Sequence, residues 1–139
     1  MIILDTNILS ELISKSPDRQ VLVWLDALPR ISIWTTSVSV FELRYGVSIL
    51  PTGKRRETLS TAVDDLLNSL LENRIMPFDT SAASCAASAA TARKALGRPV
   101  EIRDLLIAGI ANASGAALAT RNLRDFEGIG LELINPWTV

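Results

Sequence analysis

The sequence predicts a single α/β domain built around a mainly parallel sheet of about five strands. Short β-rich runs alternate along the 139 residues with longer segments of helical periodicity, the pattern of strands joined by helical crossovers. The first run, Met1–Leu4, is apolar without alternation, as expected for a strand buried on both faces. Asp5 follows, and an acid at the carboxyl end of a central parallel strand lies where open α/β sheets bind ligands.

Capping residues and helix breakers divide the first half of the chain. Helix-capping side chains stand at Thr6 or Asn7, at Asp18, and at Thr36 or Ser37. A proline follows each of the three segments that these residues begin. We therefore expect a strand at 1–4, a helix at 7–14, a helix at 18–28, a strand at 31–35 and a helix at 38–50.

The second half continues the alternation. After Gly53, a helix that packs against the core is predicted by a leucine-rich stripe: Leu59, Val63, Leu66, Leu67, Leu70 and Leu71. The short strand at 75–78 contains Pro77 and should lie at a sheet edge. We expect a small-residue helix from Asp79 or Thr80 to about Leu96, a helix at 103–114, and strands at 116–120 and 131–134.

Composition limits the class of protein. A hydrophobic content of 48% favours a compact globule, and a net charge of −1 gives no strong overall attraction to nucleic acid, so phosphate binding requires a local basic patch. The single cysteine, Cys85, excludes an internal disulfide. No signal peptide or membrane-spanning run is expected, which together with the cysteine content suggests the cytoplasm.

The absence of histidine restricts the chemistry most. It excludes Ser-His-Asp and Cys-His mechanisms as well as zinc held by histidine. If the chain is an enzyme, carboxylates or a hard metal held by carboxylates must carry the reaction.

Two further acids are candidates for the place occupied by Asp5. Glu42 lies at helical spacing with apolar residues, Val38, Tyr45 and Ile49, so an acid interrupts an apolar stripe. A buried carboxylate needs a partner or a metal, and an arginine such as Arg44 would also serve. Asp104 begins a helix whose inward positions are apolar and mostly small, Ile107, Ala108 and Ala111, so that it can approach the sheet closely. Compensation of the helix dipole, or a pair with Arg103, would explain Asp104 equally.

A fourth polar position follows the strand at 116–120. In a doubly wound sheet this strand lies beside the first, so Asn122 or Asp125 can contribute an oxygen near Asp5. A turn rich in asparagine and aspartate is also expected on loop grounds alone.

Carboxylates gathered in this way point to a hard divalent cation. Three of them about 5 Å apart repel by roughly 3 kcal/mol per pair at an effective dielectric near 20, so they take up protons or bind a cation. Oxygen ligands without histidine or cysteine select Mg²⁺ or Mn²⁺ over zinc. Metal-assisted attack of water on a phosphodiester is the reaction that this indicates.

Four segments together resemble the PIN-domain family, and most closely the VapC-type ribonuclease toxins of bacterial toxin–antitoxin pairs. They are MIILDTN at the start, SVSVFELRYG at 37–46, DLLIA at 104–108 and ATRNLRDFEGIGLELINPW at 119–137. They occur in order and span essentially the whole chain. The resemblance implies a five-stranded α/β/α sandwich and an endoribonuclease dependent on Mg²⁺ or Mn²⁺, acting on tRNA or rRNA.

The resemblance also assigns residues. Asp5, Glu42 and Asp104 match the three acidic positions that hold the metal and activate water, and Thr6 matches a supporting hydroxyl. Asn122 stands where an aspartate is frequent, which lowers the negative charge of the site, and Asp125 could compensate. The implied products are a 5′-phosphate and a 3′-hydroxyl.

The implied partners are a second copy of the chain, in a homodimer, and a VapB-type antitoxin that lays apolar residues into a groove and blocks the site. Trp24, Trp34 and the leucine-rich helix would line such surfaces or else form ordinary core. Four arginines lie close in sequence to the candidate acids and would contact phosphate or pair with those acids: Arg44, Arg103, Arg121 and Arg124. The basic run 54–56 is interpreted as a solvated helix start.

Two rival interpretations were weighed. A PIN-like module that binds nucleic acid or a partner without hydrolysis is compatible with Asn122. A phospho-acceptor receiver domain is disfavoured, because it needs a lysine after the last strand and no lysine follows Lys94.

Overall fold

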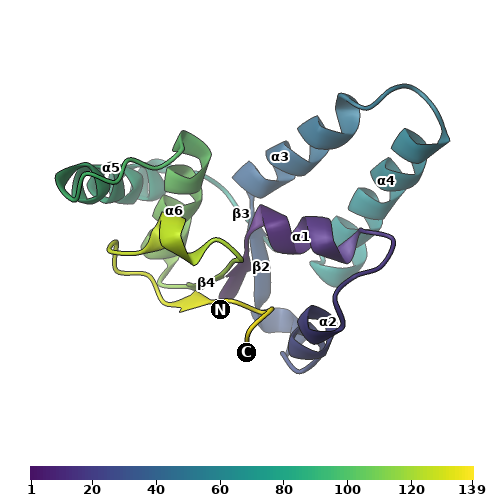
Figure 1. The fold of residues 1–139 in the computed structure, drawn as a ribbon, viewed down its shortest axis with the longest axis horizontal. Coiled ribbons are helices and arrows are strands. Elements are labelled where there is room, and N and C mark those ends of the chain that lie inside the picture. The colour runs from purple at the N-terminus through teal and green to yellow at the C-terminus, as the bar shows by residue number, and fades with distance from the viewer.

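A computed structural model describes residues 1–139 and contains one five-stranded sheet in the order β3-β2-β1-β4-β5. All four strand pairs are parallel. The strands are β1 (Ile2–Leu4), β2 (Ile33–Thr36), β3 (Ile75–Met76), β4 (Ala117–Ala119) and β5 (Leu133–Ile134). The predicted α/β class is therefore confirmed, as are the edge position of β3 and the position of β4 beside β1 (Figure 1).

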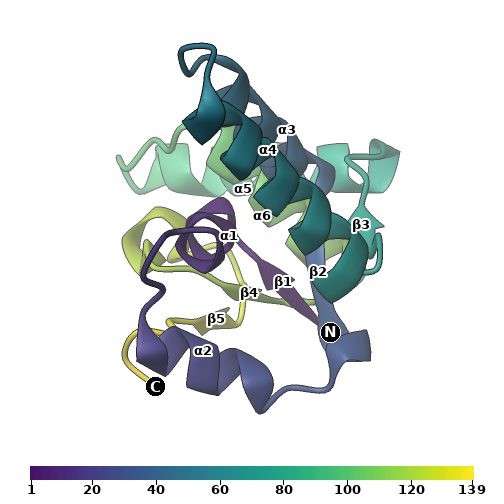
Figure 2. The ribbon, with the colours of Figure 1, turned by 90° about the vertical axis from the view of Figure 1, so that its right-hand side faces the viewer.

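The register brings polar residues of three strands to one edge of the sheet. Leu4 pairs with Ala119 across β1 and β4, and Ile3 pairs with Trp34 across β1 and β2. Asp5 and Thr120 therefore follow their strands at the same level. The next strand in the chain, β2, lies on one side of β1, whereas β4 lies on its other side (Figure 2). The carboxyl ends of β1 and β4 therefore mark the switch point of the fold.

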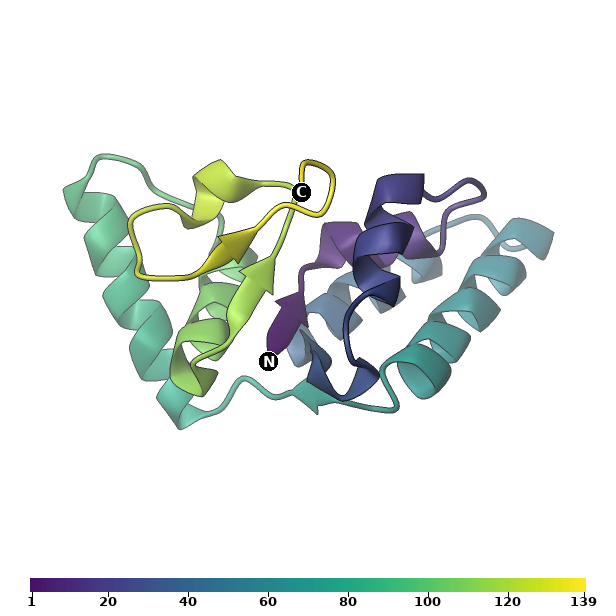
Figure 3. The same ribbon diagram turned by 90° about the horizontal axis from the view of Figure 1, so that it is seen from below.

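Helices cover both faces of the sheet, as the predicted sandwich requires. Figure 3 shows α5 and α6 on one side of the strands and the four earlier helices on the other. The helices are α1 (Thr6–Leu12), α2 (Arg19–Asp26), α3 (Ser37–Ser48), α4 (Lys54–Asp65), α5 (Thr80–Ala95) and α6 (Ile102–Ser114). Successive residues of β1 face opposite ways, so Leu4 lies in the core beneath α1 and Ile3 in the core beneath α6.

The strand expected at 31–35 begins two residues later than predicted. Residues Arg30–Ser32 form a 3₁₀ turn, η1, and Ile31 is exposed. The backbone N–H and the hydroxyl of Ser32 both donate to the carbonyl of Pro29, at 3.0 and 2.6 Å, and these bonds close the turn. The β-branched side chain of Ile31 favours a strand, but the backbone at this point makes the hydrogen bonds of a local turn instead.

The leucine-rich helix packs as predicted but changes its pitch. After α4, residues Leu66–Leu70 form a π-helical turn, η2, with the N–H of Leu71 donating to the carbonyl of Leu66. Val63, Leu66, Leu67 and Leu71 are all buried. The wider turn keeps these leucines in the core, although a regular helix was expected through this region.

Small residues bring α5 and α6 into close contact. Ala82, Ala86 and Ala89 of α5 are buried against α6, where Gly109 offers no side chain. A Cβ atom added at Gly109 would lie 2.4 Å from the carbonyl oxygen of Ala82. The approach to the sheet expected of α6 is a separate contact: its predicted inward residues Ile107, Ala108 and Ala111 are buried in one cluster with Ile3 and Leu118 of the strands. No helix of the structure is long and apolar enough to cross a membrane.

Candidate active site

Asp5 is buried at the carboxyl end of β1, with 4% of its surface exposed. Its Oδ1 accepts a hydrogen bond from the backbone N–H of Thr6 at 2.8 Å, in the geometry of a helix N-cap. Its Oδ2 accepts one from the hydroxyl of Thr120 at 2.7 Å and one from the side-chain amide of Asn7 at 3.3 Å. The helix-start role and the site role of Asp5 are therefore compatible, because one carboxylate has the geometry for both.

The environment of Asp5 is costly for a negative charge. Burial raises the pKa of its carboxyl above the usual value, and the charges of Glu42 and Asp125 raise it further. The hydrogen bonds from Thr120 and Thr6 act against this rise. A positive ion near Asp5 would relieve the repulsion.

Thr120 is a site residue that the sequence analysis did not single out. It is fully buried at the end of β4, and its hydroxyl links Asp5 to Asn7 of α1 and to the backbone of Asn122. Besides donating to Asp5, its oxygen accepts from the amide of Asn7 at 3.2 Å and from the backbone N–H of Asn122 at 3.1 Å. The available signal was a hydroxyl residue closing an otherwise apolar strand next to β1.

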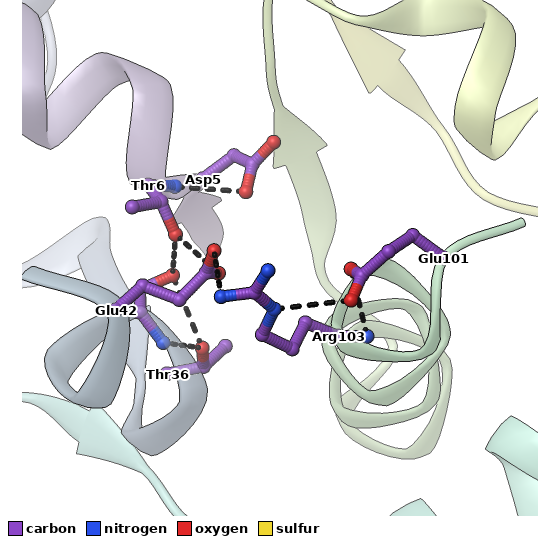
Figure 4. Close-up of polar contacts among 7 residues, drawn as sticks. Asp5, Thr6, Thr36, Glu42, Glu101 and Arg103 are labelled. Carbon is purple, nitrogen blue, oxygen red and sulfur yellow. Dashed lines mark hydrogen bonds and ion pairs between the residues drawn. The ribbon is translucent and has the colours of Figure 1, made fainter. Parts of the chain in front are cut away.

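Glu42 reaches the same edge of the sheet from α3. The Thr6 hydroxyl donates to its Oε1 at 2.9 Å, and its Oε2 lies 3.7 Å from Nη1 of Arg103 (Figure 4). The apolar stripe from which Glu42 was predicted is wrong: Tyr45 and Ile49 are exposed, at 51% and 63%. The buried face of α3 consists of Val38, Ser39 and Leu43.

Hydroxyl groups fix the start of α3 relative to α1. Thr36 caps α3 by accepting from the backbone N–H of Ser39 at 3.0 Å, and the two hydroxyls lie 3.3 Å apart. The Ser39 oxygen is also 2.9 Å from the Thr6 hydroxyl. Because that hydroxyl contacts Glu42, the position of Glu42 depends on a chain of hydrogen bonds that begins at the end of β2.

Asp104 lies in the first turn of α6 and is the most strongly perturbed acid of the site. Its pKa is raised to about 7, first by partial burial and then by the negative charges of four neighbours: Asp5, Asp125, Glu101 and Glu42. These couplings place the charge of Asp104 within reach of both Asp5 and Glu42. Asp104 is therefore coupled electrostatically to Asp5 and Glu42, although the three side chains are not close enough to enclose an ion.

The fourth predicted position is less directly connected. The Asn122 side chain is exposed and makes no hydrogen bond to the protein, and the residue precedes the 3₁₀ turn η3 (Leu123–Phe126). Asp125, within that turn, raises the pKa values of both Asp5 and Asp104. Of the two candidates, Asp125 is the one whose charge acts on the other acids.

The arginines near the site have different partners. Arg44 forms an exposed 2.6 Å ion pair with Asp64, and the arginine that pairs with Glu42 is Arg103 instead. The guanidinium of Arg121 stacks over the Trp137 ring, 4.8 Å from its centroid. Arg124 is exposed and forms no ion pair. Lys54–Arg56 begin α4, as predicted.

Trp24, Trp34 and most of the leucine stripe are ordinary core, the second of the two alternatives that the sequence left open. Trp24 and Trp34 pack against the two core clusters, and four leucines of the stripe belong to or pack against the first of them: Leu66, Leu67, Leu70 and Leu71. Phe41 and Tyr45 instead stack on the solvent face of α3, with ring centroids 5.9 Å apart, and Ile49 continues this face. The exposed stripe is on the helix that carries Glu42.

The donor set suits a hard cation that keeps much of its water. No three acidic side chains lie close enough together to enclose an ion. Neighbouring negative charges nevertheless raise the pKa values of Asp5 and Asp104, and all the donors are oxygens. Mg²⁺ is usually held by one or two carboxylates and several waters, which this arrangement allows, whereas a fully protein-ligated zinc site does not fit.

The raised pKa of Asp104 predicts a pH-dependent effect of Asp104→Asn on stability. Between the unfolded value of 3.8 and about 7, the folded protein binds more protons at this residue than the unfolded chain does, so wild-type stability falls as the pH rises through this range. The neutral asparagine escapes this loss. In chelator, the variant should melt no higher than wild type near pH 4 and higher near pH 8; a melting-temperature difference that does not change with pH would contradict the prediction.

Comparison with known proteins identifies relatives along the whole chain. A family model described as PIN domain matches residues 2–130. The chain is 39% identical over 137 residues to the VapC ribonuclease Y4jK of Sinorhizobium fredii, covering 99% of this chain and 98% of that protein.

Solved structures show the same similarity. The crystal structure of FitAcB from Neisseria gonorrhoeae has a TM-score of 0.92 and 32% identity, with 100% of both chains covered. VapBC2 from Rickettsia felis, solved bound to a DNA fragment from their promoter, has a TM-score of 0.79 and 31% identity, covering 97% of this chain and 98% of that one.

Proposed function

The chain belongs to the PIN-domain family, and we propose that it is the endoribonuclease toxin of a bacterial toxin–antitoxin pair, dependent on Mg²⁺ or Mn²⁺. The observation that carries the proposal is the buried Asp5 at the switch point of the sheet, with Glu42 held near it by the Thr6 hydroxyl and with the charge of Asp5 raising the pKa of Asp104. The name of the VapC ribonuclease relative supports RNA as the substrate class. Hydrolysis of RNA would take place in the cytoplasm.

Each acid has a distinct part in the proposed reaction. Asp5, Asp104 and Glu42 would hold the cation, and Glu42, fixed by the Thr6 hydroxyl, would also orient the attacking water. A bound Mg²⁺ or Mn²⁺ supplies positive charge for the phosphate and favours ionisation of water. Thr120 would keep the Asp5 carboxylate turned toward the edge of the sheet. In-line attack of water on phosphorus leaves a 5′-phosphate and a 3′-hydroxyl, without participation of the 2′-hydroxyl.

The direct test is cleavage of bacterial tRNA and rRNA by the purified protein, with analysis of the product ends. We expect cleavage in Mg²⁺ or Mn²⁺, none in chelator, and 5′-phosphate termini. Cleavage in chelator, or 2′,3′-cyclic phosphate ends, would contradict the proposed chemistry. Binding of RNA without cleavage in either metal would favour a non-hydrolytic binding module.

The proposed partners are a VapB-type antitoxin and a second copy of the chain. Growth arrest on expression, relieved by co-expression of a small adjacent gene, is the expected result. The exposed stripe of Phe41, Tyr45 and Ile49 offers either partner an apolar surface close to Glu42. If Glu42→Gln arrested growth as strongly as wild type, the role proposed for Glu42 would be wrong.

The partners of the arginines predict which of them contact RNA phosphates. Arg121 follows Thr120 directly and Arg124 lies in η3, and neither is paired with a carboxylate. Each of Arg121→Gln and Arg124→Gln should reduce the slope of log affinity against log salt concentration by about 0.7, the value for one phosphate contact on a single strand. Single-stranded RNA binding in chelator measures this slope.

Arg30→Gln is the matched control for this measurement. Arg30 lies in η1, which precedes β2, at the amino ends of the strands and therefore opposite to the acids. The same loss of charge there should leave the slope unchanged. Equal effects of all three variants would show that net charge, rather than contact, governs binding.

A further inference from the structure

Arg103 connects two carboxylates at the edge of the candidate active site. Its Nε donates to Oε1 of Glu101 at 3.1 Å, and its Nη1 lies 3.7 Å from Oε2 of Glu42. Figure 4 shows the guanidinium between the two acids. The side chain is 43% exposed.

Glu101 holds Arg103 in place through two hydrogen bonds. Its carboxylate caps α6 by accepting from the backbone N–H of Arg103 at 3.0 Å, while its other oxygen accepts from Nε of the same residue. The arginine is thus attached at two points to the start of α6. The contact with Glu42 is longer than either of these and is the one that an ion can most easily replace.

The contact with Arg103 occupies one of the two carboxylate oxygens of Glu42. One Glu42 oxygen accepts from Thr6 and the other faces Arg103, so both are occupied by groups of the protein. Arg103 is the guanidinium that forms ion pairs with two carboxylates here, Glu101 and Glu42.

We propose that Arg103 is a positioning residue that pairs with Glu42 in the cation-free protein and competes with the divalent cation for that carboxylate. The inference rests on the proposed function, because it assumes that the acids bind a cation. Arg103 then acts as a built-in counter-charge: it stabilises the acid cluster when no ion is bound and weakens ion binding for the same reason. Removal of its charge should therefore tighten cation binding.

The test is Mn²⁺ affinity of the full chain, measured without RNA from the EPR signal of the free ion. Arg103→Gln should bind Mn²⁺ roughly two- to five-fold more tightly, the range expected for loss of a partly exposed ion pair. A merely damaged site would bind more weakly. Arg103→Lys keeps the charge without the planar fork, so its Mn²⁺ affinity should lie between those of wild type and Arg103→Gln.

Two controls separate a specific pair from a general effect of charge. Arg44→Gln removes the same charge from the exposed pair with Asp64 and should leave Mn²⁺ affinity unchanged. In a Glu42→Gln background, the additional change Arg103→Gln should no longer tighten binding, because the carboxylate for which Arg103 competes is gone.

Each other outcome is decisive. If Asp5→Asn abolishes Mn²⁺ binding but Arg103→Gln leaves it unchanged or weakens it, the inference fails and the proposed function stands. Tightening of equal size in the Glu42→Gln background, or in Arg44→Gln, would also overturn it. A wild-type protein that binds no Mn²⁺ would overturn the inference and the metal dependence together.

Discussion

Asp5→Asn is expected to reduce RNA cleavage by roughly 10²–10³-fold, comparable to the loss of one group that stabilises the charge of a transition state. The carboxylate is buried at the switch point, and asparagine has nearly the same shape but no charge to attract a cation. It keeps one oxygen for the N–H of Thr6 and fills the same volume in the core. The change therefore removes charge while preserving the packing.

The stability of this variant should move the other way. Burial raises the pKa of Asp5, so its ionised form opposes folding, and a neutral residue there removes that cost. We expect Asp5→Asn to unfold at the same temperature as wild type or higher at pH 8 in chelator. A combined loss of activity and stability would indicate a structural rather than a catalytic role.

Asp64→Asn is the matched control for both measurements. Asp64 is exposed on α4 and pairs with Arg44, away from the acids at the switch point. The same change of chemistry should leave cleavage within about two-fold, since surface pairs contribute little. Rates would be compared at saturating Mg²⁺ on the same RNA. Retained cleavage in Asp5→Asn would exclude the metal-holding role proposed for Asp5.

Much of the fold follows from local sequence features. The uninterrupted apolar run at 1–4 predicted a central strand, Pro77 predicted an edge strand, and capping residues such as Asp18 predicted where helices begin. These features act over a few residues, so the sequence reveals them directly. The π-helical turn at Leu66–Leu70 and the 3₁₀ turn at Arg30–Ser32 depend on packing and on turn hydrogen bonds, which periodicity does not report.

The site is predictable only in part, for a similar reason. Asp5 and Asp104 could be placed from their positions at a strand end and at a helix start. Glu42 was selected through an apolar stripe that the structure does not contain, since Tyr45 and Ile49 face solvent. What holds Glu42 at the site is its contacts with Thr6 and Arg103, which come from two other helices.

Thr120 shows the limit of sequence reasoning more sharply. Its importance comes from a 2.7 Å hydrogen bond to a residue 115 positions away. That contact exists only because β4 pairs with β1 in the observed register, with Leu4 opposite Ala119. Strand order can be inferred from topology, but the atom-level contact follows only when the register is known.

Gly109→Ala is expected to be the most destabilising single methyl addition in the chain. The new Cβ would lie 2.4 Å from the carbonyl oxygen of Ala82 and 2.7 and 2.8 Å from the Cβ and backbone nitrogen of Ala86. These groups belong to α5 itself, so relief requires the two helices to separate rather than one side chain to rotate. We expect a loss of about 3 kcal/mol in the free energy of unfolding, the upper part of the usual range for overpacking.

Gly46→Ala provides the opposite control on α3. Gly46 is exposed in a helix, and a Cβ there meets nothing within 4 Å, so alanine should stabilise by roughly 0.5–1 kcal/mol through helix propensity. Urea unfolding of both variants measures the contrast.

Because α6 carries Asp104 and Arg103, separation of α5 and α6 should also weaken Mn²⁺ binding in the folded fraction of Gly109→Ala. A Gly109→Ala protein as stable as wild type would mean that α5 and α6 tolerate a wider spacing, and the site would then not depend on their close contact.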